Sequence, residues 1–114
     1  MQSDRRKELK ESYKSSKTSM GVYQIKNLLT GKSYVGITQN LKGTMNGNIF
    51  KLDSGMFKDR DLQSEWKING SSSYGQTILA ELDYDTDESK TDYTEDLKVL
   101  REMVTEDITD KKFI

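Results

Sequence analysis

The chain of 114 residues contains no cysteine, no histidine and no proline. The lack of cysteine and histidine excludes disulfide bonds, thiolate zinc sites, cysteine nucleophiles, Ser-His triads and imidazole general bases. Any catalysis must therefore depend on Tyr, Lys, Arg, Asp, Glu, Ser or Thr side chains. The lack of proline excludes a rigid proline-rich linker, so turns must be formed with Gly and Asn.

Apolar residues are also scarce, at 32% of the sequence, and no run approaches the roughly 18 apolar residues of a membrane span. The first residues, MQSDRRKELK, lack the apolar segment of a secretory signal. We therefore expect a cytoplasmic protein that does not contact a membrane. The length suits one compact domain, and we predict a basic N-terminal helix or arm over residues 1–19 and the domain over residues 20–114.

Charge is unevenly distributed, although the 18 basic and 19 acidic residues nearly balance. Residues 1–58 carry 11 basic and four acidic side chains, whereas residues 81–114 carry five basic and twelve acidic ones. A nucleic acid would favour the first half and be repelled by the last third, where acidic residues 81–110 form a candidate surface for a protein partner. The alternative is that both regions are ordinary solvated surface.

Two segments, GVYQIKN and KSYVGIT, are rich in strand-forming residues and flank a turn, which predicts a β-hairpin. If the loop is Leu28 to Gly31, opposed residues have numbers that sum to 59. Tyr23 then faces Gly36 and Tyr34 faces Ile25, which places both phenols on one side of the sheet. The missing Cβ of Gly36 leaves space above the Tyr23 ring, where we expect a phosphate or a water.

Two helices are predicted after the hairpin. Asn40 can cap a helix that begins at Leu41, but Gly43 and its neighbours 46–48 lower the helical propensity, so an irregular helix is expected. A second helix is predicted over residues 61–68, with Leu62 and Trp66 on one face and Gly70 at its end.

A third strand over residues 76–82, an acidic loop and a final helix complete the predicted order. Asp92 followed by Glu95 is typical of a capping box that opens this helix. Apolar side chains then recur at helical spacing, at Tyr93, Leu97, Leu100, Val104 and Ile108. The order predicts an α+β domain with helices over one face of a small antiparallel or mixed sheet.

The motif Gly21-Val22-Tyr23, followed after ten residues by Tyr34-Val35-Gly36, resembles the signature of the GIY-YIG nuclease superfamily. The similarity is strongest over residues 20–42 and continues in element order to about residue 108. It implies a three-stranded antiparallel sheet flanked by helices. It also implies metal-dependent endonuclease activity, the hydrolysis of phosphodiesters in nucleic acid, expected to be DNA, with Mg²⁺ or Mn²⁺.

The resemblance further implies the roles of individual residues. Tyr23 would help to activate the attacking water, Tyr34 would position the phosphate, and Glu102 would hold the metal. The residues expected to contact nucleic acid are Lys32, Lys42, Gly36 and Asn40. A phenol has an ordinary pKa of about 10, so a general-base role for Tyr23 requires nearby positive charge, for which Lys32 and Lys42 are the nearest candidates by sequence.

Two positions depart from the family pattern. Thr44 stands where the family has a helical arginine, and it cannot make a forked phosphate contact. Alignment of the last helix by its apolar positions puts Arg101 where the family has glutamate, and Glu102 is one residue further on. The alternative function is therefore a catalytically silent module of the same fold that binds nucleic acid or a protein partner.

Overall fold

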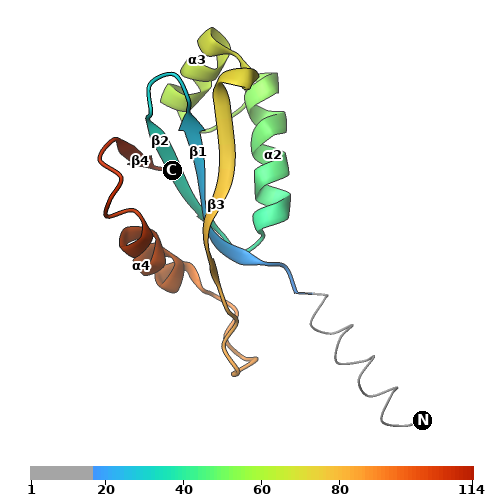
Figure 1. Ribbon diagram of the computed structural model, residues 1–114. Helices are drawn as coiled ribbons and strands as arrows, with labels where there is room; N and C mark the ends of the chain where they lie inside the picture. Colours follow the sequence, from blue (N-terminus) through green and yellow to red (C-terminus); the bar gives the residue numbers. More distant parts are fainter. Residues whose placement is uncertain (1–16) are drawn as a thin grey trace, which may run out of the picture.

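The computed structural model describes residues 17–114, so nearly all of the predicted N-terminal helix or arm lies outside the described residues. The elements are β1 (Met20–Asn27), β2 (Ser33–Thr38), α2 (Leu41–Ser54), α3 (Arg60–Asn69), a 3₁₀ turn η1 (Ser71–Ser73), β3 (Tyr74–Leu82), α4 (Thr94–Val104) and β4 (Lys111–Phe113). The strands form one sheet in the order β3-β1-β2-β4 (Figure 1). None of the helices in residues 17–114 is long and apolar enough to cross a membrane.

The predicted hairpin and its register are confirmed. Tyr23 pairs with Gly36 and Ile25 pairs with Tyr34, as the sum of 59 requires. The turn is fixed by Asn27, whose side-chain oxygen accepts hydrogen bonds from the backbone amides of Leu29 and Thr30 at 2.9 and 3.3 Å. Both signature tyrosines therefore lie on one face of the sheet.

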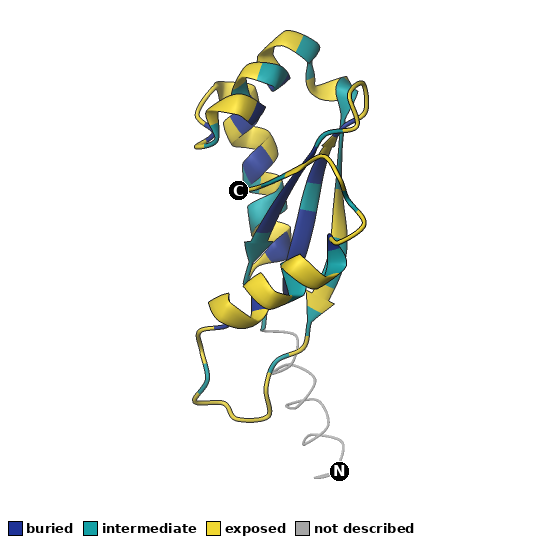
Figure 2. Cartoon of the chain, turned by 90° about the vertical axis from the view of Figure 1, so that its left-hand side faces the viewer, coloured by how far each residue is buried: buried dark blue, intermediate teal, exposed yellow. Residues whose placement is uncertain are grey.

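Helices cover both faces of the sheet, which corrects the prediction of helices on one face. Helices α2 and α3 pack on the face that carries the two tyrosines, and α4 packs on the other (Figure 1). The core under α2 and α3 contains Tyr23, Ile25, Tyr34, Leu41, Leu52, Phe57, Leu62 and Trp66. Buried residues follow the central strands along most of their length (Figure 2).

Helix α2 is continuous over 14 residues, although an irregular helix was predicted from its glycine and asparagine residues. Asn40 caps its start by accepting a hydrogen bond from the Gly43 amide at 3.1 Å. Gly55 ends it with a positive φ of 78°. Burial of Leu41 and Leu52 against the sheet outweighs the weak propensity of the segment between them.

The prediction was least accurate in the C-terminal third. Asp92 does not cap α4, because its carboxylate accepts from the amide and hydroxyl of Thr94, two residues later, and the helix has no side-chain cap. The helix ends at Val104, so Ile108 lies beyond it. The chain then returns as β4, which pairs parallel to β2. The sheet is thus four-stranded and mixed, and the expectation of three antiparallel strands was wrong.

Candidate functional site

Tyr23 and Gly36 form the centre of the candidate site. A Cβ atom added at Gly36 would clash with Cζ and the hydroxyl of Tyr23. The ring of Tyr23 therefore occupies the space that was predicted to hold a phosphate or a water, and that part of the prediction was wrong. The glycine instead lets the end of the phenol lie against β2 at Gly36, one residue beyond the last residue of β2 that pairs with β4.

The electrostatic surroundings of Tyr23 differ from those expected from the sequence. Burial raises the pKa of its phenol, while a hydrogen bond with the Asn48 side chain and the positive charge of Arg101 partly oppose this increase. The nearby positive charge thus comes from Arg101 on α4, not from the predicted Lys32 or Lys42. Since the pKa is still raised, Tyr23 is a neutral phenol at physiological pH, which favours a hydrogen-bonding role over that of a phenolate base.

Arg101 reaches the same part of the sheet from α4. Its guanidinium carbon lies 4.1 Å from the centre of the Phe113 ring on β4. The pairing of β4 with β2 stops at Val35 and Phe113, immediately before Gly36. Arg101 and the Tyr23 hydroxyl therefore approach one short stretch of β2 from two different elements.

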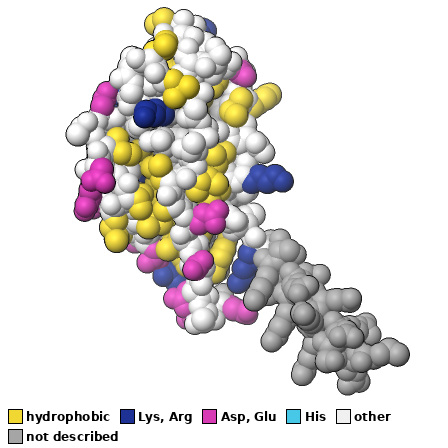
Figure 3. Space-filling model, in the orientation of Figure 1, with side chains coloured by type: hydrophobic (Ala, Val, Ile, Leu, Met, Phe, Trp, Pro, Cys, Tyr) yellow, Lys and Arg dark blue, Asp and Glu magenta, His cyan; other side chains and the backbone are white. Residues whose placement is uncertain are grey.

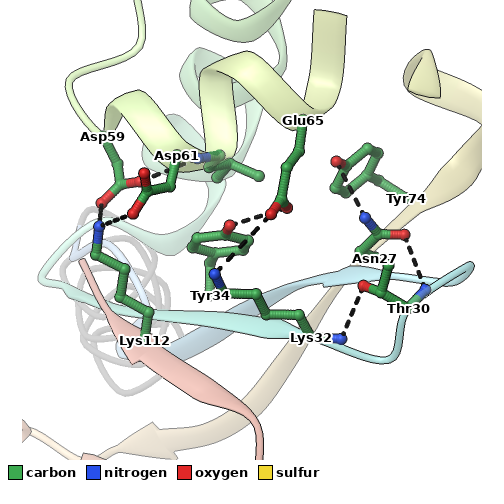
Figure 4. A network of polar contacts seen from close by, with 10 residues as sticks. Asn27, Thr30, Lys32, Tyr34, Asp59, Asp61, Glu65, Tyr74 and Lys112 are labelled. Atoms are coloured by element: carbon green, nitrogen blue, oxygen red, sulfur yellow. Dashed lines mark hydrogen bonds and ion pairs between the residues drawn. The ribbon is translucent and has the colours of Figure 1, made fainter. Parts of the chain in front are cut away.

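Tyr34 is engaged within the protein (Figure 4). Its side chain is fully buried, and its hydroxyl donates a hydrogen bond to Glu65 on α3 at 2.9 Å. Burial, this hydrogen bond and the negative charge of Glu65 together raise the pKa of Tyr34 well above its ordinary value. Tyr34 is therefore a neutral hydrogen-bond donor whose proton is already directed toward a carboxylate.

Lys32 meets the same carboxylate. Its ammonium lies 3.9 Å from Glu65 and 5.1 Å from the centre of the Tyr34 ring. Two residues predicted to meet nucleic acid, a signature tyrosine and a lysine, are thus both joined to Glu65. A phosphate that approached Tyr34 would have to displace or overcome this carboxylate.

A second ion cluster lies beside Tyr34 and ties β4 to α3 (Figure 4). The Lys112 ammonium lies 2.8 Å from both Asp59 and Asp61, and hydrogen bonds to these carboxylates raise the pKa of Lys112 to about 12. Asp59 also caps α3 by accepting from the Leu62 amide at 3.0 Å. The surroundings of Tyr34 therefore contain three carboxylates.

Three other predicted site residues, Lys42, Asn40 and Glu102, lie at the start of α2 and on α4. Lys42 is exposed in the first turn of α2, while Asn40 is used as the cap of that helix. Glu102 is exposed on α4, where its negative charge acts on the neighbouring Arg101. Within residues 17–114 no three acidic side chains gather into a group that could hold a metal ion.

Sequence reasoning missed the parts played by Glu65 and Asn48 and the direction of Arg101. Glu65 follows Tyr34 by 31 positions, and no local spacing connects them. Asn48 was read only as a weak helix former, yet it is buried next to Tyr23. Arg101 was noted only as a departure from the family pattern, and its direction depends on the position of Phe113 on β4.

Comparison with solved structures identifies two structures of one similar domain. The chain resembles the catalytic domain of the homing endonuclease I-TevI with a TM-score of 0.64 and 21% identity, covering 83% of this chain and 97% of that one. It resembles a glutamate-to-alanine mutant of the catalytic domain of the intron endonuclease I-TevI with a TM-score of 0.54 and 26% identity, covering 85% and 100%. No family profile and no curated protein sequence matches the chain. By its fold and its paired signature strands, the chain belongs to the GIY-YIG nuclease superfamily.

Proposed function

We propose that this domain hydrolyses phosphodiester bonds in DNA in a reaction that depends on a divalent metal ion. The observation that carries the proposal is the placement of the Tyr23 hydroxyl across Gly36, at the edge of the sheet and within the electrostatic reach of Arg101. A neutral hydroxyl and a guanidinium at one place can both donate hydrogen bonds to phosphate oxygens or to an attacking water. The structural similarity to the I-TevI catalytic domain supports this reading.

Within this proposal the phenol acts as a donor. Tyr23 keeps its proton at neutral pH and orients the attacking water or a nonbridging phosphate oxygen through that proton. Lys42, exposed at the start of α2, contributes positive charge along the path of the nucleic-acid backbone. Asn40 fixes this part of α2, so we assign it a supporting role rather than direct contact with DNA.

The metal would be held by Glu102. Mg²⁺ is often bound by one or two protein carboxylates, with waters and substrate phosphates as its other ligands, so a single exposed glutamate fits such an ion. When bound, the cation would offset negative charge that develops on the phosphate. Arg101 and Tyr23, in contrast, need no metal to donate hydrogen bonds.

The test is cleavage of supercoiled and branched DNA by the purified protein in the presence of Mg²⁺ or Mn²⁺, with chelator in parallel. We expect nicked or linear products that require the cation and that disappear after Glu102→Gln. Glu106→Gln, an exposed carboxamide substitution just beyond α4, is the matched control and should cleave like the wild type. Absence of cleavage by the folded wild-type protein on both substrates would contradict the proposal.

A second candidate function is supported by the contacts of Glu65. This carboxylate accepts a hydrogen bond from the Tyr34 hydroxyl and pairs with Lys32. Two side chains that are expected to contact a phosphate therefore already have a partner within the protein. A catalytically silent module that binds nucleic acid weakly, or a protein through its acidic end, would have this property. Acidic side chains gather toward the lower end of the face in Figure 3, near the loop of residues 83–93.

Replacing Glu65 with glutamine is expected to strengthen DNA binding about fivefold at low salt, since two unit charges 4 Å apart interact by about 1 kcal/mol in water. The amide keeps an oxygen that can accept from Tyr34, but it releases Lys32 from its ion pair. The dissociation constant of a short labelled duplex, measured as a function of salt concentration, tests this. The gain should shrink as the salt concentration rises.

Glu88→Gln is the matched control for this measurement. It makes the same change in net charge in the exposed loop at the opposite end of the sheet from α3 (Figure 1). Equal gains for the two variants would mean that the effect comes from overall charge and not from the release of Lys32 from Glu65.

A further inference from the structure

The predicted position of the phosphate-binding arginine is occupied by Thr44, whose hydroxyl is already engaged. Its Oγ1 lies 2.7 Å from Oγ1 of Thr38, so this pair joins the end of β2 to the first turn of α2. A threonine at this position supplies no positive charge and no fork of donors. A positively charged side chain that binds the phosphate must therefore come from another element of the fold.

Residues 17–114 contain only two arginines, Arg60 and Arg101. Arg60 is exposed at the start of α3, between the two carboxylates that bind Lys112. Arg101 is half-buried on α4 and lies against the ring of Phe113. Only Arg101 acts electrostatically on the Tyr23 phenol.

The position of Arg101 is restricted by Phe113, which lies where β4 ends its pairing with β2. Phe113 pairs with Val35, and the next residue of β2 is Gly36, across which the Tyr23 hydroxyl lies. The guanidinium carbon lies 4.1 Å from the centre of the Phe113 ring, so the aromatic surface restricts the movement of the group. The phenol and the guanidinium are thus presented from β1 and α4 at the point where β4 ends its contact with β2.

The guanidinium also has an unused donor. Its Nε is buried and has no hydrogen-bond partner, which is costly for a polar group unless a ligand or water satisfies it. No carboxylate among residues 17–114 lies within ion-pair distance of Arg101, whereas Lys32, Lys90, Lys98 and Lys112 all have such partners. Arg101 therefore packs against an aromatic ring and has no ion-pair partner among the described residues, although the charge of the neighbouring Glu102 acts on it.

We propose that Arg101 is the phosphate-binding arginine of this domain and takes the place of the missing arginine at Thr44. Its guanidinium and the Tyr23 hydroxyl hold nonbridging oxygens of one phosphodiester at the end of β2, beside Gly36. The ligand is a backbone phosphate of a nucleic acid, and the contact does not depend on the base sequence. This inference rests on the proposed function, because it assigns a ligand to the same site.

The test uses three variants and two readouts. Arg101→Met keeps a long stem against Phe113 without the charge, Arg101→Lys keeps the charge without the fork, and Arg60→Met is the control. Binding of a short duplex is measured with chelator present, so that no cleavage occurs, and cleavage is measured separately to obtain kcat and KM.

Arg101→Met is expected to lower kcat by about 10²–10³-fold, as the loss of one donor to transition-state charge does in other enzymes. It should also reduce the slope of log affinity against log salt by about one, the value expected for one lost phosphate contact. Arg101→Lys should restore the salt slope but only part of kcat. Arg60→Met should leave both quantities near those of the wild type.

The outcomes separate the inference from the proposed function. If the wild type cleaves and Arg101→Met behaves like Arg60→Met, the inference is overturned and the proposed function stands. If the wild type binds without cleaving, the salt slope alone decides the role of Arg101. If it neither binds nor cleaves, both are overturned. If Arg101→Met does not fold, Arg101→Lys decides. A wild-type kcat in Arg101→Lys would overturn the inference, because lysine lacks the paired donors of the guanidinium.

Discussion

Tyr23→Phe is expected to lower the rate of DNA cleavage by about 10²–10⁴-fold, the usual contribution of a positioned proton donor or acceptor. The substitution removes only the hydroxyl, and the remaining ring still fills the space over Gly36. The hydrogen bond with Asn48 is lost, but Asn48 keeps its contact with Gln76 at 3.1 Å. Initial rates with Mn²⁺ or Mg²⁺ measure the loss, and thermal unfolding verifies that the variant is folded.

Tyr84→Phe is the matched control for Tyr23→Phe. Tyr84 also uses its hydroxyl in a hydrogen bond, to the carbonyl of Thr18 at 2.6 Å, but it belongs to the core cluster under α4. It should cleave at the wild-type rate. A Tyr23→Phe variant as active as Tyr84→Phe would show that the hydroxyl across Gly36 takes no part in the reaction.

Gly36→Ala is expected to destabilise the domain by about 1–3 kcal/mol and to abolish most of the cleavage activity. The new Cβ would clash with the end of the Tyr23 ring, and this ring is 4% exposed, so it cannot swing into solvent without opening the core. Either the ring moves and its hydroxyl leaves the edge of the sheet, or β1 and β2 separate. Urea unfolding and the cleavage rate measure the two effects.

Gly47→Ala is a demanding control for Gly36→Ala. Gly47 lies within α2, and nothing is within 4 Å of a Cβ built there. The same addition of one methyl group should therefore stabilise the helix by about 0.5–1 kcal/mol. A comparable loss of stability in both variants would indicate that neither effect comes from contact with Tyr23.

The hairpin was predictable because both its turn and its pairing are local. Asn27 and Gly31 define the loop, and once the loop is fixed the register follows from counting residues. The same counting placed Tyr23 and Tyr34 on one face. It could not predict that the Tyr23 ring fills the space over Gly36, because that depends on the side-chain conformation and not on the register.

The rest of the site depends on contacts between residues far apart in sequence. Glu65 meets Tyr34 only because α3 packs over that end of the sheet, and no periodic pattern encodes this contact. Strand β4 has three residues and gives no recognisable strand signal, so the platform beneath Arg101 could not be foreseen. Helix α4 was predicted from its apolar stripe, but the actual direction of Arg101 depends on where β4 lies.

The parallel pairing of β4 with β2 joins residues that are 78 positions apart in the sequence, such as Ser33 and Lys111. Such a contact carries a large loop-closure cost, so we expect it to form after the local hairpin and the helices. Phe113, against which Arg101 packs, belongs to the sheet pairing with the largest separation in sequence. A partly folded chain would already carry both signature tyrosines on the hairpin but would lack the Phe113 support for Arg101, so the proposed phosphate site would be complete only after β4 pairs with β2.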